Sequence, residues 1–147
     1  MTPQRVSLIT LGVADLAVSR KFYGDLGWTP KDEVPGQVIF YQLNGSVLGL
    51  FGIGPLAHDQ GRPDAKLGTG AITLAQNFAT EADVDAAYAK ALSVGATALK
   101  APEKVFWGGY SGYYADPDGH PWEVAFNPFW ELDADGNQIL PEAPDAD

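Results

Sequence analysis

A carboxylate within an otherwise apolar run is the first candidate for chemistry in this chain. Glu123 stands in the stretch from His120 to Phe126, where its neighbours are proline, tryptophan, valine and alanine. Such a carboxylate is costly to bury unless it binds a partner or stays hydrated. Three roles follow: a general base in an isomerase or lyase step, a partner for a cationic ligand group, or a group held by hydrogen bonds without present function.

A hairpin is expected to position this carboxylate. Asp116, Pro117, Asp118 and Gly119 form a turn signal between two alternating runs. Pro117 fixes φ, the side chain of Asp116 can bond the turn backbone, and Gly119 accepts a positive φ. The sequence therefore predicts that Glu123 lies on the strand that leaves this turn.

The same order of elements occurs twice along the chain, with an offset of about 65 residues. Asp15 and Thr80 are the expected helix N-caps, and Gly27 and Gly95 end the helices that follow them. Runs rich in β-branched and aromatic residues predict the strands. These strands are expected at 6–13, 28–34, 38–43, 46–51, 71–75, 97–100 and 120–126, with an eighth in the alternating run that leads into Asp116.

Three segments are expected to connect these elements. Asn44-Gly45 is typical of a type I′ hairpin turn, because both residues tolerate a positive φ. Gly52 to Thr69 is rich in Gly, Pro and Asp and predicts an irregular connection. Pro102 to Gly109 is expected to be a loop.

The repeated order predicts an α+β fold made of two βαβββ modules. One such unit has a single apolar sheet face and too little core to stand alone. We therefore expect one domain, residues 1–147, with an open curved mixed sheet around a central cleft. The first module spans 5–56, the second 70–128, and an acidic tail spans 129–147.

Composition excludes several classes of function. The net charge is −10, with nine Lys and Arg against nineteen Asp and Glu, so a nucleic-acid partner is not expected. The chain has no cysteine, which removes disulfides and thiol nucleophiles. No membrane span or leader is evident, and the expected location is cytoplasmic. Acidic residues that we expect to be solvated gather near the end: Glu131, Asp133, Asp135, Glu142, Asp145 and Asp147.

Two segments resemble a known family. GVADLAVSRKFYGDLGW (Gly12 to Trp28) and YYADPDGHPWEV (Tyr113 to Val124) are similar to the opening strand-helix and the closing hairpin of the vicinal oxygen chelate superfamily. That superfamily holds glyoxalase I, extradiol dioxygenases and bleomycin-resistance proteins. The resemblance implies two βαβββ modules around a pocket, usually in a homodimer. It also implies, in metal-dependent members, four strand residues that bind a divalent ion.

The four positions that the resemblance transfers to this chain are Leu8, Gly49, Ala71 and Glu123. Leucine, glycine and alanine offer no ligand atom, and a hard cation needs several oxygen or nitrogen ligands. We therefore expect no metal and no cofactor, with Glu123 as a residual ligand position. His58 and His120 are expected to be exposed loop residues rather than metal ligands.

Strand alternation predicts which side chains line a ligand pocket. Strand positions that point to the same sheet face as these four metal-site positions form an apolar surface with a few hydroxyl groups. Four aromatic residues are candidates for the rim of the pocket. The same aromatic residues could instead belong to a core or a dimer interface. The predicted ligand-binding set is Thr10, Phe40, Phe51, Thr73, Trp107, Tyr110, Tyr114 and Glu123.

These observations favour a metal-independent protein that binds a small hydrophobic or cationic organic compound, with sequestration as the role that the bleomycin-resistance branch suggests. The alternative is a glyoxalase-like lyase or isomerase that uses Glu123 as general base or residual metal ligand. A homodimer is the expected assembly.

Overall fold

The computed structural model describes residues 2–142, and its chain divides into two compact units. The first unit comprises Met1–Ile72 and Asp116–His120, and the second comprises Thr73–Ala115 and Pro121–Asp147. Asp145 and Asp147 of the predicted acidic tail lie outside the described residues.

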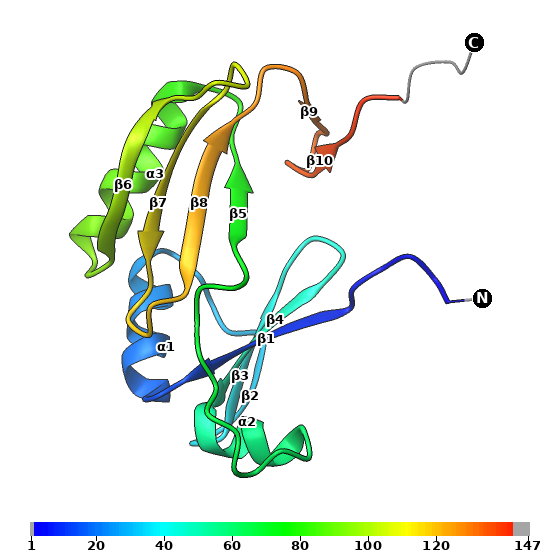
Figure 1. Ribbon diagram of the computed structural model, residues 1–147, viewed down its shortest axis with the longest axis vertical. Helices are drawn as coiled ribbons and strands as arrows, with labels where there is room; N and C mark the ends of the chain where they lie inside the picture. Colours follow the sequence, from blue (N-terminus) through cyan, green and yellow to red (C-terminus); the bar gives the residue numbers. More distant parts are fainter. Residues whose placement is uncertain (1, 143–147) are drawn as a thin grey trace. The chain divides into compact units, whose positions relative to one another are not determined.

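The first unit holds a four-stranded mixed sheet. Its strand order is β1-β4-β3-β2, with β1 parallel to β4 and the other neighbours antiparallel. Helix α2 directly follows β4 (Figure 1). The elements are β1 (Leu8–Val13), α1 (Leu16–Asp25), β2 (Asp32–Val34), β3 (Val38–Gln42), β4 (Val47–Gly52) and α2 (Ile53–Asp59).

The second unit repeats this topology. Its sheet order is β5-β8-β7-β6, with β5 parallel to β8 and the other neighbours antiparallel. Helix α3 covers one face of this sheet (Figure 1). The elements are β5 (Leu74–Asn77), α3 (Glu81–Ser93), β6 (Thr97–Lys104), β7 (Tyr110–Ala115), β8 (Pro121–Phe126), β9 (Glu131–Leu132) and β10 (Gln138–Ile139). The predicted α+β class and the βαβββ repeat are confirmed.

Both predicted helix caps are confirmed. The Asp15 carboxylate accepts the backbone N–H of Ala17 at 2.9 Å, and the Thr80 hydroxyl accepts that of Asp83 at 3.1 Å. Each bond satisfies an N–H group that has no partner within its helix. Gly27 and Gly95 follow the two helices with φ values of 107° and 108°, a conformation that favours glycine.

Each unit has its own packed interior. In the first, the rings of Tyr23, Trp28 and Tyr41 lie with centroids 5.5 to 6.1 Å apart. In the second, Val84 of α3 and Val124 of β8 are both fully buried. Side chains alternate along a strand, so the α3 face of the second sheet carries Val124 and its even-numbered neighbours.

The turn between β7 and β8 is held by the first unit. Oδ1 of Asp116 accepts the backbone N–H groups of Asp118 and His120 at 3.0 and 2.9 Å, as the turn prediction requires. Its Oδ2 accepts the hydroxyl of Tyr23 at 2.7 Å. Asp118 in turn accepts the backbone N–H of Ala14 at 2.7 Å.

Three predictions about connections were wrong. The segment expected to be irregular contains α2, whose Pro55 lies in the first helical turn, where no N–H acceptor exists within the helix. Strand β6 continues through Pro102 to Lys104, which an edge strand with register shifts allows. Asn44 does not have a positive φ, since among described residues only glycines do, so the turn at Gly45 is not type I′.

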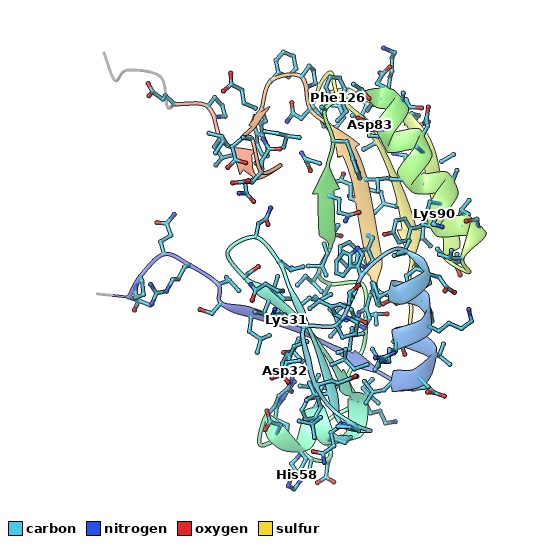
Figure 2. All side chains as sticks on the ribbon, turned by 180° about the vertical axis from the view of Figure 1, so that it is seen from behind. Lys31, Asp32, His58, Asp83, Lys90 and Phe126 are labelled. Atoms are coloured by element: carbon cyan, nitrogen blue, oxygen red, sulfur yellow. The ribbon has the colours of Figure 1, made fainter. Side chains whose placement is uncertain are left out.

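Two predictions about single residues were also wrong. Ala71 lies in a bend, because β5 begins only at Leu74. His120 is 7% exposed and its Nε2 lies 2.7 Å from the carbonyl oxygen of Gly12, so it is not a free turn residue. His58 is exposed, as expected, but it lies on α2 rather than in a loop (Figure 2). Within the described residues, no helix combines the length and the apolar character that a bilayer span needs.

Candidate functional site

The register of the second sheet fixes the neighbours of Glu123. On β8 it lies opposite Ala75 of β5 on one side and Tyr113 of β7 on the other. Since Val124 is buried on the α3 face, Glu123 and Tyr113 share the opposite face of the sheet. Glu123 is half-buried there.

Tyr113 is the cross-strand neighbour of this carboxylate. Partial burial, followed by the negative charge of Glu123 and its acceptor oxygen, raises the pKa of Tyr113 above its ordinary value. The phenol therefore stays protonated near neutral pH and presents a hydrogen-bond donor beside the carboxylate.

A pocket opens on this face of the second unit. Its volume is about 540 Å³, within the range of small-molecule sites. Glu123 is the one charged side chain among the described residues that line it. The lining consists of Ala75, Asn77, Trp107, Glu123, Ala125, Asn127, Phe129 and Trp130.

Local turns place the aromatic walls of the pocket. Trp107 lies in a tight turn after β6, in which the N–H of Val105 donates to the carbonyl of Gly109 at 3.0 Å. Its indole lies directly over Gly109, where any Cβ would collide with the ring. On the other side, the Asn127 side chain accepts the N–H of Phe129 at 2.9 Å and so turns the chain just after β8. Two turns thus build the walls, one between β6 and β7 and the other directly after β8.

The structure brings together two of the predicted ligand-binding residues, Trp107 and Glu123. Tyr110 and Tyr114 lie on the α3 face of the sheet instead. The hydroxyl of Tyr110 donates to Asp85 of α3 at 2.6 Å, and this bond is the main cause that raises its pKa to about 12. Tyr114 is 3% exposed.

Sequence reasoning missed Tyr113, Asn127, Phe129 and Trp130. The signal for Tyr113 was present in the hairpin. Ala115 pairs with Pro121 next to the turn, so the residues two positions farther from the turn on each strand, Tyr113 and Glu123, pair as well. The signal for the others was the run of Asn, Pro and aromatic residues that directly follows the last long strand.

The remaining predicted residues do not line this pocket. In the first unit, Thr10 of β1 lies opposite Gly49 of β4, and the ring of Phe40 packs on Gly49 so closely that an added Cβ would stand 3.2 Å from it. Phe51 is half-buried on β4. Thr73 is exposed just before β5 and is not part of the second-unit pocket.

The side chains at the four metal-ligand positions that the family resemblance implies do not fit a divalent metal ion. In the first sheet, Leu8 lies opposite Val47, and Gly49 carries no side chain. In the second, the neighbour of Glu123 on β5 is Ala75. Residues 2–142 contain no group of three or more His, Cys, Asp or Glu side chains arranged to hold a metal ion. One carboxylate is a poor substitute for the several ligands that such an ion needs.

Fold and sequence together define the class of protein. The sequence model of the glyoxalase/bleomycin resistance protein/dioxygenase superfamily matches residues 5–124. The chain belongs to this superfamily, which agrees with the resemblance seen in its two motif segments.

Known structures and relatives extend this assignment. The crystal structure of a glyoxalase-related enzyme from Fulvimarina pelagi is 39% identical, with a TM-score of 0.89 over 95% of this chain and 100% of that chain. A lactoylglutathione lyase from Agrobacterium tumefaciens is 23% identical, with a TM-score of 0.69 over 90% and 100% of the two chains, and shows the fold alone. An uncharacterized protein of Mycobacterium bovis is 43% identical over 56 residues, which are 38% of this chain and only 36% of that protein.

Proposed function

We propose that this chain is a metal-independent binding protein for a small organic cation with an apolar or aromatic body. The observation that carries the proposal is the second-unit pocket, whose lining combines one carboxylate, Glu123, with the aromatic side chains of Trp107, Phe129 and Trp130. A carboxylate pairs with a cation, and the faces of aromatic rings attract cations as well. Sequestration of such a compound is the role that we propose for the pocket.

Charge, shape and polarity of the pocket support the same class of ligand. A cation over an aromatic face gains about 0.5–2 kcal/mol, with tryptophan the best partner. The amides of Asn77 and Asn127 add neutral polar groups at the wall.

The test compares three probes that share one phenylethyl body: phenethylammonium, phenethyl alcohol and hydrocinnamate. Isothermal titration calorimetry should show phenethylammonium binding at least about tenfold more tightly than the neutral alcohol, since one charge-assisted contact is worth about 1.5–3 kcal/mol. Glu123→Gln, which removes the charge and keeps the size of the side chain, should remove this difference. Glu142→Gln is the matched control, because it removes an exposed carboxylate outside the pocket.

Two results would contradict the proposal. Equal affinity for the cation and the alcohol would show that Glu123 does not select charge. An equal loss in the Glu142→Gln variant would assign the preference to the net charge of −10 rather than to the pocket.

Metal independence has its own test. The donor set supports it, because the partners of Glu123 across the sheet are an alanine and a tyrosine. Binding of phenethylammonium should be the same before and after treatment with EDTA. Stoichiometric metal in freshly purified protein that is lost on Glu123→Ala would overturn this part of the proposal.

A second candidate is an enzyme in which Glu123 acts as general base in a lyase or isomerase step. The cross-strand pair of Tyr113 and Glu123 supports it, because it places a proton donor next to a proton acceptor that lines the pocket. The relative described as a glyoxalase-related enzyme supports it too. Exchange of a proton next to a carbonyl group of a small ketone in D₂O, followed by NMR and lost in Glu123→Gln, would favour this candidate.

The assembly and the location remain predictions. A homodimer is supported by large apolar side chains that stand in solvent, among them Phe106, which is fully exposed, and Phe129 at 67%. Analytical ultracentrifugation of the wild type and of Phe106→Ser tests it. The cytoplasmic location is tested by cell fractionation.

A further inference from the structure

The first unit contains a separate pocket whose charge is opposite to that of the Glu123 site. Its volume is about 320 Å³, and it lies beside β1, α2 and the segment 60–72. Among the described residues, the lining includes Arg62 and Lys66 and has no acidic side chain. The lining consists of Thr10, Leu11, Gly12, Ile53, Leu56, Gln60, Arg62, Lys66, Leu67, Gly68, Ile72 and His120.

Neither cation of this pocket has a carboxylate partner within residues 2–142. The ion pairs of this part of the chain use Arg20, Lys21, Lys100 and Lys104. Arg62 donates instead to the neutral side-chain oxygen of Gln60, from Nε at 3.1 Å and from Nη2 at 2.6 Å. The lining of this pocket thus carries two basic and no acidic side chains, although the whole chain has nineteen acidic and nine basic residues.

A buried polar atom of the pocket lining is also unused. His120 is 7% exposed, and its Nε2 must carry a hydrogen, because its partner at 2.7 Å is the carbonyl oxygen of Gly12, which can only accept. The other ring nitrogen, Nδ1, is buried and has no hydrogen-bond partner in the described part of the chain. In a neutral ring with its hydrogen on Nε2, Nδ1 can only accept a hydrogen bond, so the charged contacts of an anionic ligand fall to Arg62 and Lys66 and not to His120.

Apolar side chains form a further part of the wall. Helix α2 packs so closely on β1 that a Cβ added at Gly12 would stand 3.2 Å from Leu56 and 3.3 Å from Ile53. Ile53 and Ile72 are 37% and 52% exposed, so they can still cover an apolar ligand surface.

We propose that this first-unit pocket binds a small organic carboxylate with an apolar body. The carboxylate pairs with Arg62 and Lys66, and the body rests on Ile53, Leu56 and Ile72. A guanidinium group suits this role because its planar donors match both oxygens of a carboxylate. This site is independent of the Glu123 pocket, which lies in the other unit and takes the opposite charge.

Hydrocinnamate and phenethyl alcohol test the proposal in an NMR titration that follows the ¹H–¹⁵N signals of the backbone amides. Hydrocinnamate should shift the amide signals of residues 60–68 and of Gly12, and phenethyl alcohol should do so only at much higher concentration. Arg62→Gln and Lys66→Gln should each weaken hydrocinnamate binding about tenfold, the value of one charge-assisted contact. Both residues are exposed, so neither change should affect folding.

Two controls separate the pocket from general charge. Lys90→Gln removes an exposed cation on α3, outside the pocket, and should leave the affinity unchanged within about twofold. Glu123→Gln should also leave it unchanged, which distinguishes this site from the proposed cation pocket. Inorganic phosphate, which carries charge without an apolar body, should compete only weakly.

Each contrary outcome overturns the proposal. Absence of hydrocinnamate binding at millimolar concentration would do so, as would equal binding of the alcohol. An equal loss in Lys90→Gln would reduce the effect to net charge. Strong competition by phosphate would assign the cations to a phosphate group rather than to an apolar carboxylate.

Discussion

The hydrogen bond between Tyr23 and Asp116 offers the sharpest test of how the first unit is held together. The Tyr23 hydroxyl donates to Oδ2 of Asp116 at 2.7 Å, and the two residues are 0% and 2% exposed. Tyr23→Phe removes only the hydroxyl and keeps the ring, which packs edge-on against Phe22 at 5.0 Å. The change therefore isolates one buried hydrogen bond.

The expected loss of stability follows from the remaining partners of Asp116. Its Oδ1 keeps the backbone N–H groups of Asp118 and His120, whereas Oδ2 loses the Tyr23 hydroxyl. A hydrogen bond to a carboxylate is worth about 1.5–3 kcal/mol, and burial leaves little water to replace it. We expect Tyr23→Phe to lower the free energy of unfolding by about 2 kcal/mol, which corresponds to roughly 4–8 °C in Tm.

Tyr41→Phe is a matched control within the same aromatic cluster. Tyr41 is 2% exposed, and its hydroxyl has no hydrogen-bond partner among the described residues. Burial is the main cause that raises the pKa of this phenol. The Tyr41 hydroxyl is already buried without a partner. We therefore expect its removal to leave the free energy of unfolding unchanged or to raise it by up to about 1 kcal/mol.

Urea denaturation followed by circular dichroism measures both variants, and hydrogen exchange of amides in β1 and β4 assigns the loss to the first unit. The reasoning fails if Tyr23→Phe costs less than about 0.5 kcal/mol, which would be within the range of ordinary surface changes. It also fails if Tyr41→Phe costs as much as Tyr23→Phe, because then the ring environment and not the hydrogen bond would determine the effect.

Three further predictions concern the second unit. Gly109→Ala should weaken phenethylammonium binding severalfold by calorimetry, because the new Cβ collides with the Trp107 indole; unchanged affinity would remove Trp107 from the site. Asp85→Asn should lower the pKa of Tyr110 from about 12 toward its ordinary value of 10.0, as read by NMR titration of labelled tyrosine. Since this pKa is raised by folding, its contribution to stability is complete below pH 10 and disappears as the pH rises through about 12. Gly112→Ala should cost about 1–3 kcal/mol in urea denaturation, because a Cβ there stands 2.8 Å from backbone atoms of β6; a neutral result would show that the strand yields freely.

Local chemistry made the repeated elements predictable. Asp15 and Thr80 are caps in the structure because each side chain satisfies a free backbone N–H at the start of its helix. Asp116 and Gly119 mark the turn for an equally local reason, since the one accepts turn N–H groups and the other has a φ of 92°. These signals depend on neighbours in the sequence and require no knowledge of the fold.

Helix α2 could not be predicted in the same way. Gly54 and Pro55 are unfavourable in helix interiors, and together they resemble a connection. The helix forms because its Ala57 is buried and its Leu56 packs near Gly12 of β1, contacts that only tertiary structure supplies. Long-range packing thus overrides weak local propensity.

The candidate site was predictable in part. Glu123 was found because a carboxylate in an apolar strand is unusual, but the tyrosines predicted for the pocket rim, Tyr110 and Tyr114, lie on the α3 face. A shift of one residue in a strand moves a side chain to the other face, so Tyr114 is buried near α3 while Tyr113 lies opposite Glu123 on the pocket face. Phe129 and Trp130 lie beyond the last long strand, and their position depends on the turn that Asn127 closes.

The five residues from Asp116 to His120 have a consequence for any attempt to divide this protein into halves. They are encoded within the second repeat, yet they supply the hydrogen-bond partners of Tyr23, Ala14 and the Gly12 carbonyl in the first unit. A fragment that ends at residue 72 would keep a complete βαβββ topology and lose all three partners. The two repeats therefore share a topology, but the first unit is not encoded by one continuous segment. Any exchange or separate expression of the first repeat has to include residues 116–120 as well.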